Sequence, residues 1–283
     1  MTGVAGGAAG PGSQRSPLRQ EALREALVPG SRLWTQVRVL RQTGSTNEDL
    51  LADATSGAGA GVVLVAEEQT RGRGRQDRGW QSQPGAALTF SVLLRPAGVP
   101  PASRGWLPLL AGVAVASALR AQTGLDIGLK WPNDVLVGTG TPGGTGKLAG
   151  ILAEQAGDAI VVGIGINVSQ TQDELPPGQA TSLWLQGAVS TDREALLAAV
   201  LREFERWYLR WIADPQPGDA DASGLRAEYL RLCTTIGRDV RVELPGGGVL
   251  AGRACDVDGV GRLLVNAPNG LQAVSAGDII HLR

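Results

Sequence analysis

Residues 72–80 read Gly72-Arg73-Gly74-Arg75-Gln76-Asp77-Arg78-Gly79-Trp80, which places three arginines and three glycines in nine residues. Glycine lets a backbone take positive φ and approach a ligand closely, and the planar guanidinium of arginine binds carboxylate or phosphate through paired hydrogen bonds. The stretch therefore predicts an anion-binding loop. Arginine-glycine runs also occur in solvated loops and in disordered nucleic-acid-binding tails, and the stretch alone does not separate these alternatives.

The segments on either side of this loop favour an ordered structure. Val62 to Glu67 and Leu88 to Leu94 are apolar, strand-like runs, so the arginine loop is expected to lie on a sheet scaffold. The whole chain carries a net charge of −1. It has no overall positive field with which to hold a nucleic acid or an anionic membrane, so any cationic function must be local.

Composition restricts the chemistry further. With 283 residues, of which 43% are hydrophobic, the chain can bury a large core and form more than one domain. Its two cysteines, Cys233 and Cys255, lack CxxC spacing, which predicts neither a disulfide framework nor a zinc site and favours a reducing compartment. Catalysis by a Ser-His-Asp or Cys-His arrangement would require the single histidine, His281, to reach the site from the end of the chain, and we do not expect that.

The first residues suggest no targeting signal. Residues 1–17 are rich in Gly, Ala, Ser and Pro and lack the charged start and apolar core of a signal peptide, so a disordered tail is expected. No apolar run approaches the ~20 residues that span a bilayer. A short amphipathic helix is predicted over Leu18 to Leu27, ended by Pro29-Gly30, and a strand over Leu33 to Leu40.

A polar segment, Ser45-Thr46-Asn47, begins the next predicted helix. Ser45 and Glu48 have the spacing of a capping box, and the residues beyond them give the helix an apolar face. Two interpretations are open. The polar side chains cap the helix only, or together with the free N–H groups at the helix start they bind the polar head of a small ligand.

A second candidate segment follows a long apolar helix predicted over Trp106 to Gln122. There, Lys130, Asn133 and Asp134 stand at the end of a strand, because Pro132 has no N–H for further pairing. Charged residues between apolar flanks are seldom buried without partners. Lys130 and Asp134 therefore indicate either a cleft or a structural ion pair.

Two further strands carry candidate residues. After a Gly/Thr/Pro hairpin loop at 138–146, Lys147 stands at the start of a strand that runs to Leu152. Ala159 to Val168 reads as a buried strand with Gly163 and Gly165 on one face. These glycines either let a ring lie flat against the backbone or let a helix pack closely.

The pattern of apolar residues changes in the last third of the chain, from helical spacing to short alternating runs. Asp192 to Ile212, with two tryptophans facing inward, and Leu225 to Leu232 predict two more helices. From about Thr235, short alternating runs divided by Gly-rich turns predict a small five-stranded barrel appended to the main domain.

Five motifs in register resemble those of the biotin protein ligase family. In order, they are Ser45-Thr46-Asn47, Gly72 to Trp80, Lys130-Trp131-Pro132-Asn133-Asp134, Lys147-Leu148-Ala149-Gly150-Ile151-Leu152 and Gly163-Ile164-Gly165-Ile166-Asn167-Val168. The resemblance runs from about Ser31 to the last residue. It implies an α+β fold, with a mixed-sheet catalytic domain like that of class II aminoacyl-tRNA synthetases and lipoate ligases, and a small C-terminal SH3-like β-barrel.

The resemblance also implies a division of the chain. We expect a flexible tail and short helix at 1–30, a biotin ligase catalytic domain at 31–233 and a C-terminal SH3-like domain at 234–283. Some members of the family carry an N-terminal DNA-binding domain. The residues before Ser31 are too few for one here, so the monofunctional type is expected.

The implied activity is that of an ATP-dependent ligase. It would activate biotin as biotinyl-5′-AMP, with ATP and Mg²⁺ as cofactors, and transfer biotin to a lysine of a biotin carboxyl carrier domain of an acyl-CoA or pyruvate carboxylase. Charge is consistent with this chemistry, because about four negative charges on ATP and one on biotin must meet within ~3.5 Å, which needs fixed cations. We expect a cytoplasmic monomer or weak dimer with no DNA or membrane partner.

Two alternatives remain at this stage. A lipoate-type acyl-protein ligase would use the same fold and adenylate chemistry, and the Ser-Thr-Asn segment and Gly-Arg-Gly-Arg loop are the features expected of the biotin branch. A biotin-responsive regulator would need a basic recognition helix ahead of Ser31, and Arg15 to Arg24 offers too little for that.

Three residues are expected to be catalytic, Lys147 and Arg75 by resemblance and Asp134 because the acceptor lysine must lose a proton at neutral pH. Lys147 bridges the biotin carboxylate and the α-phosphate, Arg75 holds the adenylate, and Asp134 orients or deprotonates the acceptor lysine. Biotin would be bound by Ser45, Thr46, Asn47, Gln69, Gly72, Arg73, Gly74, Arg75, Lys147, Gly150, Gly163 and Gly165. ATP would be bound by Arg73, Arg75, Arg78, Trp80, Lys130, Asn133, Lys147 and Asn167. No protein-held metal is expected.

Asp77 departs from the family pattern, in which glycine usually stands at that place. Aspartate tolerates a left-handed backbone better than most residues, so the loop is still expected to fold. The Asp77 carboxylate could pair with Arg75 or Arg78 and thereby change how long the ligand is retained.

Overall fold

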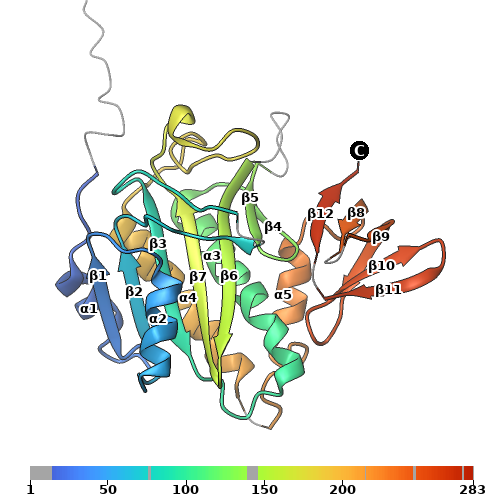
Figure 1. The fold of residues 1–283 in the computed structure, drawn as a ribbon, viewed down its shortest axis with the longest axis horizontal. Coiled ribbons are helices and arrows are strands. Elements are labelled where there is room, and N and C mark those ends of the chain that lie inside the picture. Colours follow the sequence, from blue (N-terminus) through green and yellow to red (C-terminus); the bar gives the residue numbers. More distant parts are fainter. Residues whose placement is uncertain are drawn as a thin grey trace, which may run out of the picture.

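The computed structural model describes residues 15–75, 78–138, 146–213, 215–244, 247–275 and 277–282. Apolar strands of the first part pair into a seven-stranded sheet in the order β1-β2-β3-β7-β6-β5-β4 (Figure 1). These strands are β1 (Gln36–Leu40), β2 (Val62–Ala66), β3 (Ala87–Leu94), β4 (Ile127–Lys130), β5 (Asp134–Val137), β6 (Gly146–Ala156) and β7 (Ala159–Asn167). β1 and β2 run parallel and the other neighbours antiparallel, so the sheet is mixed, as expected.

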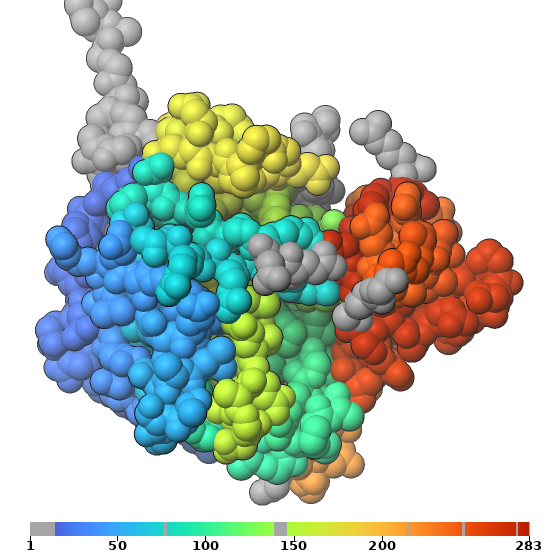
Figure 2. Space-filling view, in the orientation of Figure 1, coloured from blue at the N-terminus to red at the C-terminus, as the bar shows by residue number. Residues whose placement is uncertain are grey.

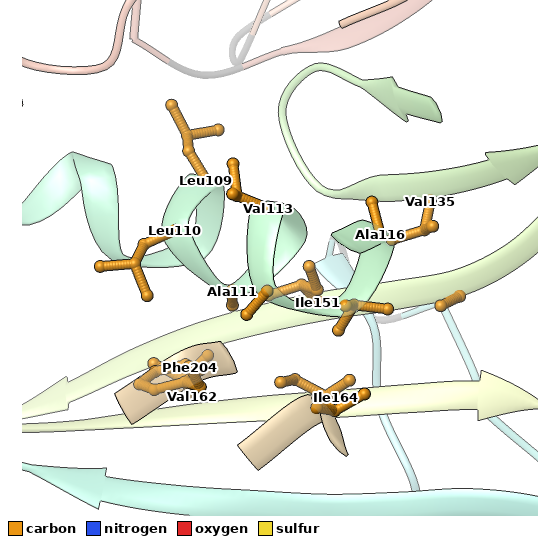
Figure 3. Close-up of a cluster of buried hydrophobic side chains, with 14 of the residues drawn as sticks. Leu109, Leu110, Ala111, Val113, Ala116, Val135, Ile151, Val162, Ile164 and Phe204 are labelled. Carbon is orange, nitrogen blue, oxygen red and sulfur yellow. The ribbon is translucent and has the colours of Figure 1, made fainter. Parts of the chain in front are cut away.

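Helices cover both faces of this sheet. α2 (Thr46–Thr55) packs against β3, β6 and β7 on one face, and α3 (Trp106–Thr123) and α4 (Arg193–Trp211) pack together on the other (Figure 1). Figure 3 shows the core between α3, α4 and the sheet, with the labelled side chains of Leu109, Leu110, Ala111, Val113, Ala116, Val135, Ile151, Val162, Ile164 and Phe204. The double cover explains why every residue of β2 and β3 is buried.

α3 is a core helix with an unusual length and composition. Together with the turn before it, Pro101–Thr123 is the one described helix that is long and apolar enough to cross a membrane, contrary to the sequence-based expectation that no run reaches that length. However, 67% of its most apolar window is buried inside the protein. Burial against a sheet and a second helix is typical of the central helix of a folded domain.

The first elements differ slightly from the predicted ones. α1 (Gln20–Leu27) matches the predicted helix, whereas β1 begins at Gln36 instead of Leu33. The reason is a turn in which Ser31 Oγ accepts hydrogen bonds from the Leu33 and Trp34 N–H groups at 3.1 and 2.7 Å. A serine hydroxyl that binds the backbone in this way competes with strand pairing.

α5 (Leu225–Leu232) leads into the C-terminal sheet. This antiparallel sheet contains β8 (Asp239–Glu243), β9 (Val249–Val257), β10 (Leu263–Ala267), β11 (Gly270–Val274) and β12 (Asp278–His281), in the order β11-β10-β9-β8-β12. Two buried indoles fix it to the first part, because Trp106 Nε1 donates to the Gly259 carbonyl at 3.0 Å and Trp131 Nε1 to the Gly261 carbonyl at 3.1 Å. The α+β class with a small antiparallel C-terminal unit is therefore confirmed.

Candidate active site

A cavity of about 990 Å³ lies where the arginine loop, the start of α2, the large sheet and strand β12 meet. Figure 2 shows the loop segment in cyan at the surface, between α2 in blue, the yellow segment that follows β7 and the orange-red C-terminal sheet. The predicted site residues that line this cavity are Ser45, Thr46, Asn47, Gln69, Arg73, Gly74, Arg75, Arg78, Trp80, Lys130, Asn133, Asp134, Lys147, Gly150, Gly163, Gly165 and Asn167. The fold thus brings residues of five separate motifs into one site.

Gly72 is the exception, because it does not line the cavity. Its carbonyl accepts the Trp80 N–H at 2.8 Å, and a Cβ at this position would overlap the Trp80 carbonyl oxygen and the Gln69 side chain. Gly72 is therefore a buried residue at the base of the arginine loop, where its carbonyl joins the start of the loop to Trp80 at its end. Trp80 and Gln69 approach this position too closely for a side chain, which explains the glycine, and a direct biotin contact of Gly72 stays a prediction.

Ser45 begins α2 as its N-cap. The Ser45 hydroxyl accepts from the Glu48 N–H at 3.5 Å, and Ser45 is also buried at the cavity wall. The predicted capping box is only half formed. The Glu48 carboxylate turns instead to Arg73 Nη2 at 3.0 Å, since a guanidinium is a stronger partner than a backbone N–H.

The next two residues of α2 form a buried polar network. Gln69 Oε1 accepts from Thr46 N–H and Oγ1 at 2.8 and 3.0 Å, and Thr46 Oγ1 lies 2.6 Å from Ser91 Oγ. Ser91 Oγ also donates to Asn47 Oδ1 at 2.6 Å, while Asn47 Nδ2 donates to Glu154 Oε2 at 2.7 Å. The donors and acceptors at this end of the cavity are therefore held in place before any ligand arrives.

The two interpretations of the paired glycines apply at different positions. A Cβ at Gly163 would overlap the carboxamide of Asn47, so this glycine allows α2 to pack closely. A Cβ at Gly165 would overlap the indole of Trp80, and one at Gly150 would lie 3.2 Å from Trp80 Cζ3. Gly165 and Gly150 thus form a flat floor for an aromatic ring, and in this structure the ring belongs to the protein itself.

The three loop arginines point into different surroundings. Arg73 pairs with Glu48 and lies 3.8 Å from Glu154. Arg75 Nη1 donates to Asn133 Oδ1 at 3.4 Å, and burial, followed by the nearby charge of Arg78, lowers the Arg75 pKa. The charge of Asp134 only partly opposes this effect, so Arg75 remains a partly desolvated cation, which favours the arrival of an anion.

Lys147 and Asp134 form the central ion pair of the site. Lys147 Nζ lies 2.6 Å from Asp134 Oδ1, between the adjacent strands β6 and β5. From the sequence, the candidate ion pair was Lys130 with Asp134. In the structure, Asp134 pairs with Lys147 instead. Burial lowers the pKa of Lys130, and Asp134 only partly opposes that effect.

Two asparagines of the cavity are held by the backbone. Asn133 Nδ2 donates to the Ile151 carbonyl at 3.0 Å. Asn167 Nδ2 donates to the Thr181 carbonyl at 2.9 Å, and its Oδ1 accepts from Gln170 Nε2 at 3.0 Å. Both side chains therefore fix the position of loops at the cavity, and Asn133 also holds Arg75.

The C-terminal sheet, mainly β12 and the ends of β8, contributes residues that sequence reasoning missed. The cavity is also lined by Arg238, Glu243, Asp278, Ile279, Ile280, His281 and Leu282. Asp278 forms an ion pair with Arg78 of the arginine loop. No local pattern in the sequence signals these contacts, because they join β12 to a loop some 200 residues earlier.

His281 does reach the site, contrary to expectation. Its Nε2 lies 3.1 Å from Thr235 Oγ1, which accepts the Trp131 N–H at 3.2 Å just before the Pro132-Asn133-Asp134 turn. Burial lowers the His281 pKa to about 4, with further contributions from Lys130 and Arg238. His281 is thus neutral at physiological pH, and through Thr235 it holds the turn that begins at Trp131.

The carboxylates do not form a metal site of their own. Among the described residues, no group of three or more His, Cys, Asp or Glu side chains could hold an ion. Magnesium prefers oxygen ligands and often binds through substrate phosphates and water with one or two carboxylates. Glu243 and Asp278 are carboxylates of the cavity wall that fit this mode.

The fold and the site together define a ligase that activates a carboxylic acid as its adenylate, and the chain belongs to the biotin protein ligase family. Residues 39–170 match the Biotin/lipoate A/B protein ligase family, and residues 235–282 match the Biotin protein ligase C terminal domain. The chain is 46% identical to the biotin–[acetyl-CoA-carboxylase] ligase of Mycobacterium tuberculosis over 274 residues, which cover 95% of this chain and 97% of that protein.

A further relative and a solved structure come from the same family. The chain is 30% identical to the biotin–[acetyl-CoA-carboxylase] ligase of Paracoccus denitrificans, with 85% of this chain and 98% of that protein covered. Among solved structures, the biotin protein ligase from Aquifex aeolicus in complex with biotin and ATP has a TM-score of 0.69 and 29% identity, covering 88% of this chain and all of that one.

Proposed function

We propose that this chain activates biotin with ATP and transfers it to the ε-amino group of a lysine in a biotin carboxyl carrier domain. The observation that carries the proposal is the position of Lys147. It stands with Asp134 and Arg75 in one cavity that also contains a pre-organised polar end and a flat glycine floor. A bicyclic ureido acid needs both of these features, together with cations for its carboxylate.

The first step joins two anions. A carboxylate oxygen of biotin attacks the α-phosphorus of ATP, the bond from that phosphorus to the bridging oxygen breaks, and pyrophosphate leaves. Lys147 would contact the biotin carboxylate and the α-phosphate, and Arg75 would hold the same groups. Fixed cations in a site shielded from water stabilise the charge that develops without reorganisation, which is often worth several kcal/mol.

The polar end at α2 would hold the ureido ring. Thr46, Asn47 and Gln69 present amide and hydroxyl groups whose orientation is set by mutual hydrogen bonds. Trp80, lying on Gly165, would form the wall against which the apolar part of biotin packs. A rigid ring bound in a preformed slot loses little further conformational freedom on binding.

The nucleotide would bind toward the C-terminal strand. Arg78 and Lys130 line that side of the cavity, and Lys130 lies close enough to lower the His281 pKa. Magnesium, held mainly by the triphosphate, would neutralise part of its charge, with Glu243 as an oxygen donor of the cavity wall and Asp278 as a second one once Arg78 turns to the phosphates. Asn133 and Asn167 would position the surrounding loops.

In the second step, the acceptor amine attacks the acyl carbon and AMP leaves. With a pKa of about 10.4, only on the order of one lysine in a thousand is neutral at pH 7. The acceptor ammonium would replace Lys147 as the ion-pair partner of Asp134. Asp134 would then orient this ammonium and accept one of its protons. The nitrogen lone pair then forms the amide as the bond from carbon to the phosphate oxygen breaks.

The partner is a carrier domain of an acetyl-CoA carboxylase, by analogy with the named relatives. Pyruvate carboxylase is a further candidate acceptor. We expect no DNA partner. The enzyme would act in the cytoplasm as a monomer or weak dimer. Its catalytic unit would span residues 31–233 and its C-terminal unit residues 234–283.

The test is transfer to a purified carrier domain. With ATP, Mg²⁺ and biotin, intact-mass spectrometry should show one added biotinyl group, and peptide mapping should place it on the acceptor lysine. A carrier in which that lysine is replaced by arginine is the matched control and should gain no mass. Absence of transfer, or equal labelling of the control, would contradict the proposal.

A second measurement isolates Asp134. When enzyme loaded with biotinyl-AMP is mixed with carrier, Asp134→Asn should slow transfer by about tenfold to a thousandfold, the range typical of a general base. Unchanged transfer by this variant would remove Asp134 from the second step.

A further inference from the structure

The segment before α1, residues 15–19, lies across the bases of both loops that line the cavity. We call it the strap. The Leu18 N–H donates to Glu67 Oε1 at 2.6 Å, where the segment carrying the arginine loop begins. Glu67 Oε2 binds Arg193, and Arg193 in turn donates to the Ser16 carbonyl at 2.6 Å. A Cβ at Gly85, where that loop segment ends, would lie 3.2 Å from the Arg15 Cβ.

Arg15 fastens the strap to the other loop, residues 168–181. Its guanidinium binds the Glu174 carboxylate as a fork, with distances of 2.9 and 2.6 Å. It also donates to Ser169 Oγ and to the Ser169 carbonyl at 3.3 and 3.0 Å. The Arg15 side chain is only 14% exposed, and its hydrogen bonds lower the Glu174 pKa to about 2. A paired, partly buried fork of this kind fixes orientation as well as distance.

The loop that Arg15 holds is bonded directly to Lys147. The Lys147 N–H donates to the Gln179 carbonyl at 2.6 Å, and the Lys147 carbonyl accepts from the Thr181 N–H at 3.0 Å. Between Glu174 and Gln179 the chain contains Pro176 and Pro177, which restrict backbone rotation and also line the cavity. An anchor at Glu174 therefore reaches the backbone of Lys147 through a short connection, in which the two prolines restrict rotation and Gly178, with φ of 116°, forms the turn before Gln179.

We propose that Arg15 is a positioning residue for adenylate formation: by holding Glu174 and Ser169, it sets the backbone of Lys147 and so the place of its ammonium. This inference rests on the proposed role of Lys147. The Arg15 side chain forms its hydrogen bonds with Ser169 and Glu174 of the 168–181 loop, so the effect on Lys147 is expected to pass through that loop.

The expected kinetic effect is specific. If Lys147 bridges carboxylate and α-phosphate most strongly in the transition state, its displacement lowers kcat more than it weakens biotin binding. A displacement of about 1 Å at a reacting group can cost on the order of a hundredfold, so the smaller shift expected from a loosened loop should lower kcat about tenfold.

The experiment compares Arg15→Gln, Glu174→Gln and the double variant with wild type in the full chain. Adenylate formation gives kcat and the KM for biotin, and calorimetric titration with biotin gives the binding stoichiometry. Arg19→Gln is the matched control, because Arg19 belongs to the same strap but pairs at the surface with Glu194 of α4, with its own side chain 76% exposed. Hydrogen exchange over 175–182 reports loop order independently of activity.

We expect both single variants to lose kcat about tenfold with the KM for biotin within about twofold, full stoichiometry and faster exchange over 175–182. The double variant should be no worse than either single one, since the two residues act as a unit. Arg15→Lys should recover part of the loss, and Arg19→Gln should match wild type.

Three outcomes would overturn the inference: Arg15→Gln with a kcat within about twofold of wild type, a loss fully explained by reduced stoichiometry, or an equal loss in Arg19→Gln. Failure of the proposed function is distinguishable, because wild type would then form no biotinyl-AMP at all, while exchange over 175–182 would still report whether Arg15 orders the loop.

Discussion

The indole of Trp80 lies on the backbone of Gly165, so closely that a Cβ at position 165 would overlap the ring. Trp80 comes from the end of the arginine loop, whereas Gly165 lies in the centre of the sheet on β7. This contact therefore joins the arginine loop to the glycine floor of the central sheet. Loop position and ring slot depend on each other.

Gly165→Ala should weaken biotin binding. The added methyl group must displace the indole, and overpacking of this kind typically costs about 1–3 kcal/mol, so biotin affinity should fall roughly tenfold. Gly150→Ala is the matched comparison, because its Cβ would lie 3.2 Å from the ring edge and requires a much smaller shift. Titration calorimetry of both variants decides this, and biotin affinity in Gly165→Ala equal to that in Gly150→Ala would count against the account of the floor.

Arg75→Gly should release the adenylate early. Arg75 is partly buried beside Asn133, and loss of one charged contact weakens retention by about 1.5–3 kcal/mol, or tenfold or more in residence time. Released biotinyl-AMP labels lysines at random, but this chain contains only Lys130 and Lys147. The label should therefore appear on a lysine-rich bystander protein. Unchanged dissociation of biotinyl-AMP would remove Arg75 from this role.

Asp77 lies outside the described residues, and its effect on retention stays a prediction from sequence. If its carboxylate pairs with Arg75 or Arg78 and so competes with the ligand, Asp77→Gly should lengthen the residence time of biotinyl-AMP. If the side chain faces solvent, the dissociation rate should not change. The same dissociation assay distinguishes the two.

The ion pair of Arg78 with Asp278 holds the arginine loop to the C-terminal strand without ligand. Anionic ligands should compete for Arg78 and order the loop around themselves, so cleavage by trypsin at the loop arginines should fall when biotin and ATP are added. Asp278→Asn should increase cleavage in the free enzyme and leave the ligand-bound enzyme protected. Equal cleavage with and without ligands in wild type would contradict loop closure.

His281 should make stability depend on pH. Its folded pKa of about 4 lies below its ordinary value near 6.5, so between these values the unfolded chain binds a proton that the folded chain does not. The free energy of unfolding therefore falls as pH drops through this window. It should fall less in His281→Gln, as measured by urea midpoints at about pH 7.5 and about pH 5. Parallel pH dependence of variant and wild type would contradict this.

Much of the site could be predicted because its residues stand in short local patterns. Lys147 at a strand start and Gly165 within an apolar run are positions that backbone periodicity and glycine chemistry indicate directly. The apolar runs indicated individual strands and helices and the small C-terminal β unit, whereas the fold class of the main domain and the residue roles came from the resemblance.

The remainder depends on contacts between distant segments. Arg15, Asp278 and His281 reach the cavity or its loops from the two ends of the described chain, and nothing in their neighbours marks them. Gly72 illustrates the opposite limit. Its motif was identified, but only the packed structure shows that its missing side chain makes room for Trp80 and Gln69.

The most direct test of the central claim is the product formed from ATP, Mg²⁺ and either biotin or lipoate, analysed by mass spectrometry for the acyl-AMP. The account predicts biotinyl-AMP from wild type, little or no lipoyl-AMP, and a rate several hundredfold lower in Lys147→Ala, equivalent to about 3–4 kcal/mol of lost transition-state stabilisation. Lipoyl-AMP as the preferred product, or biotinyl-AMP formed by Lys147→Ala within about tenfold of wild type, would contradict it.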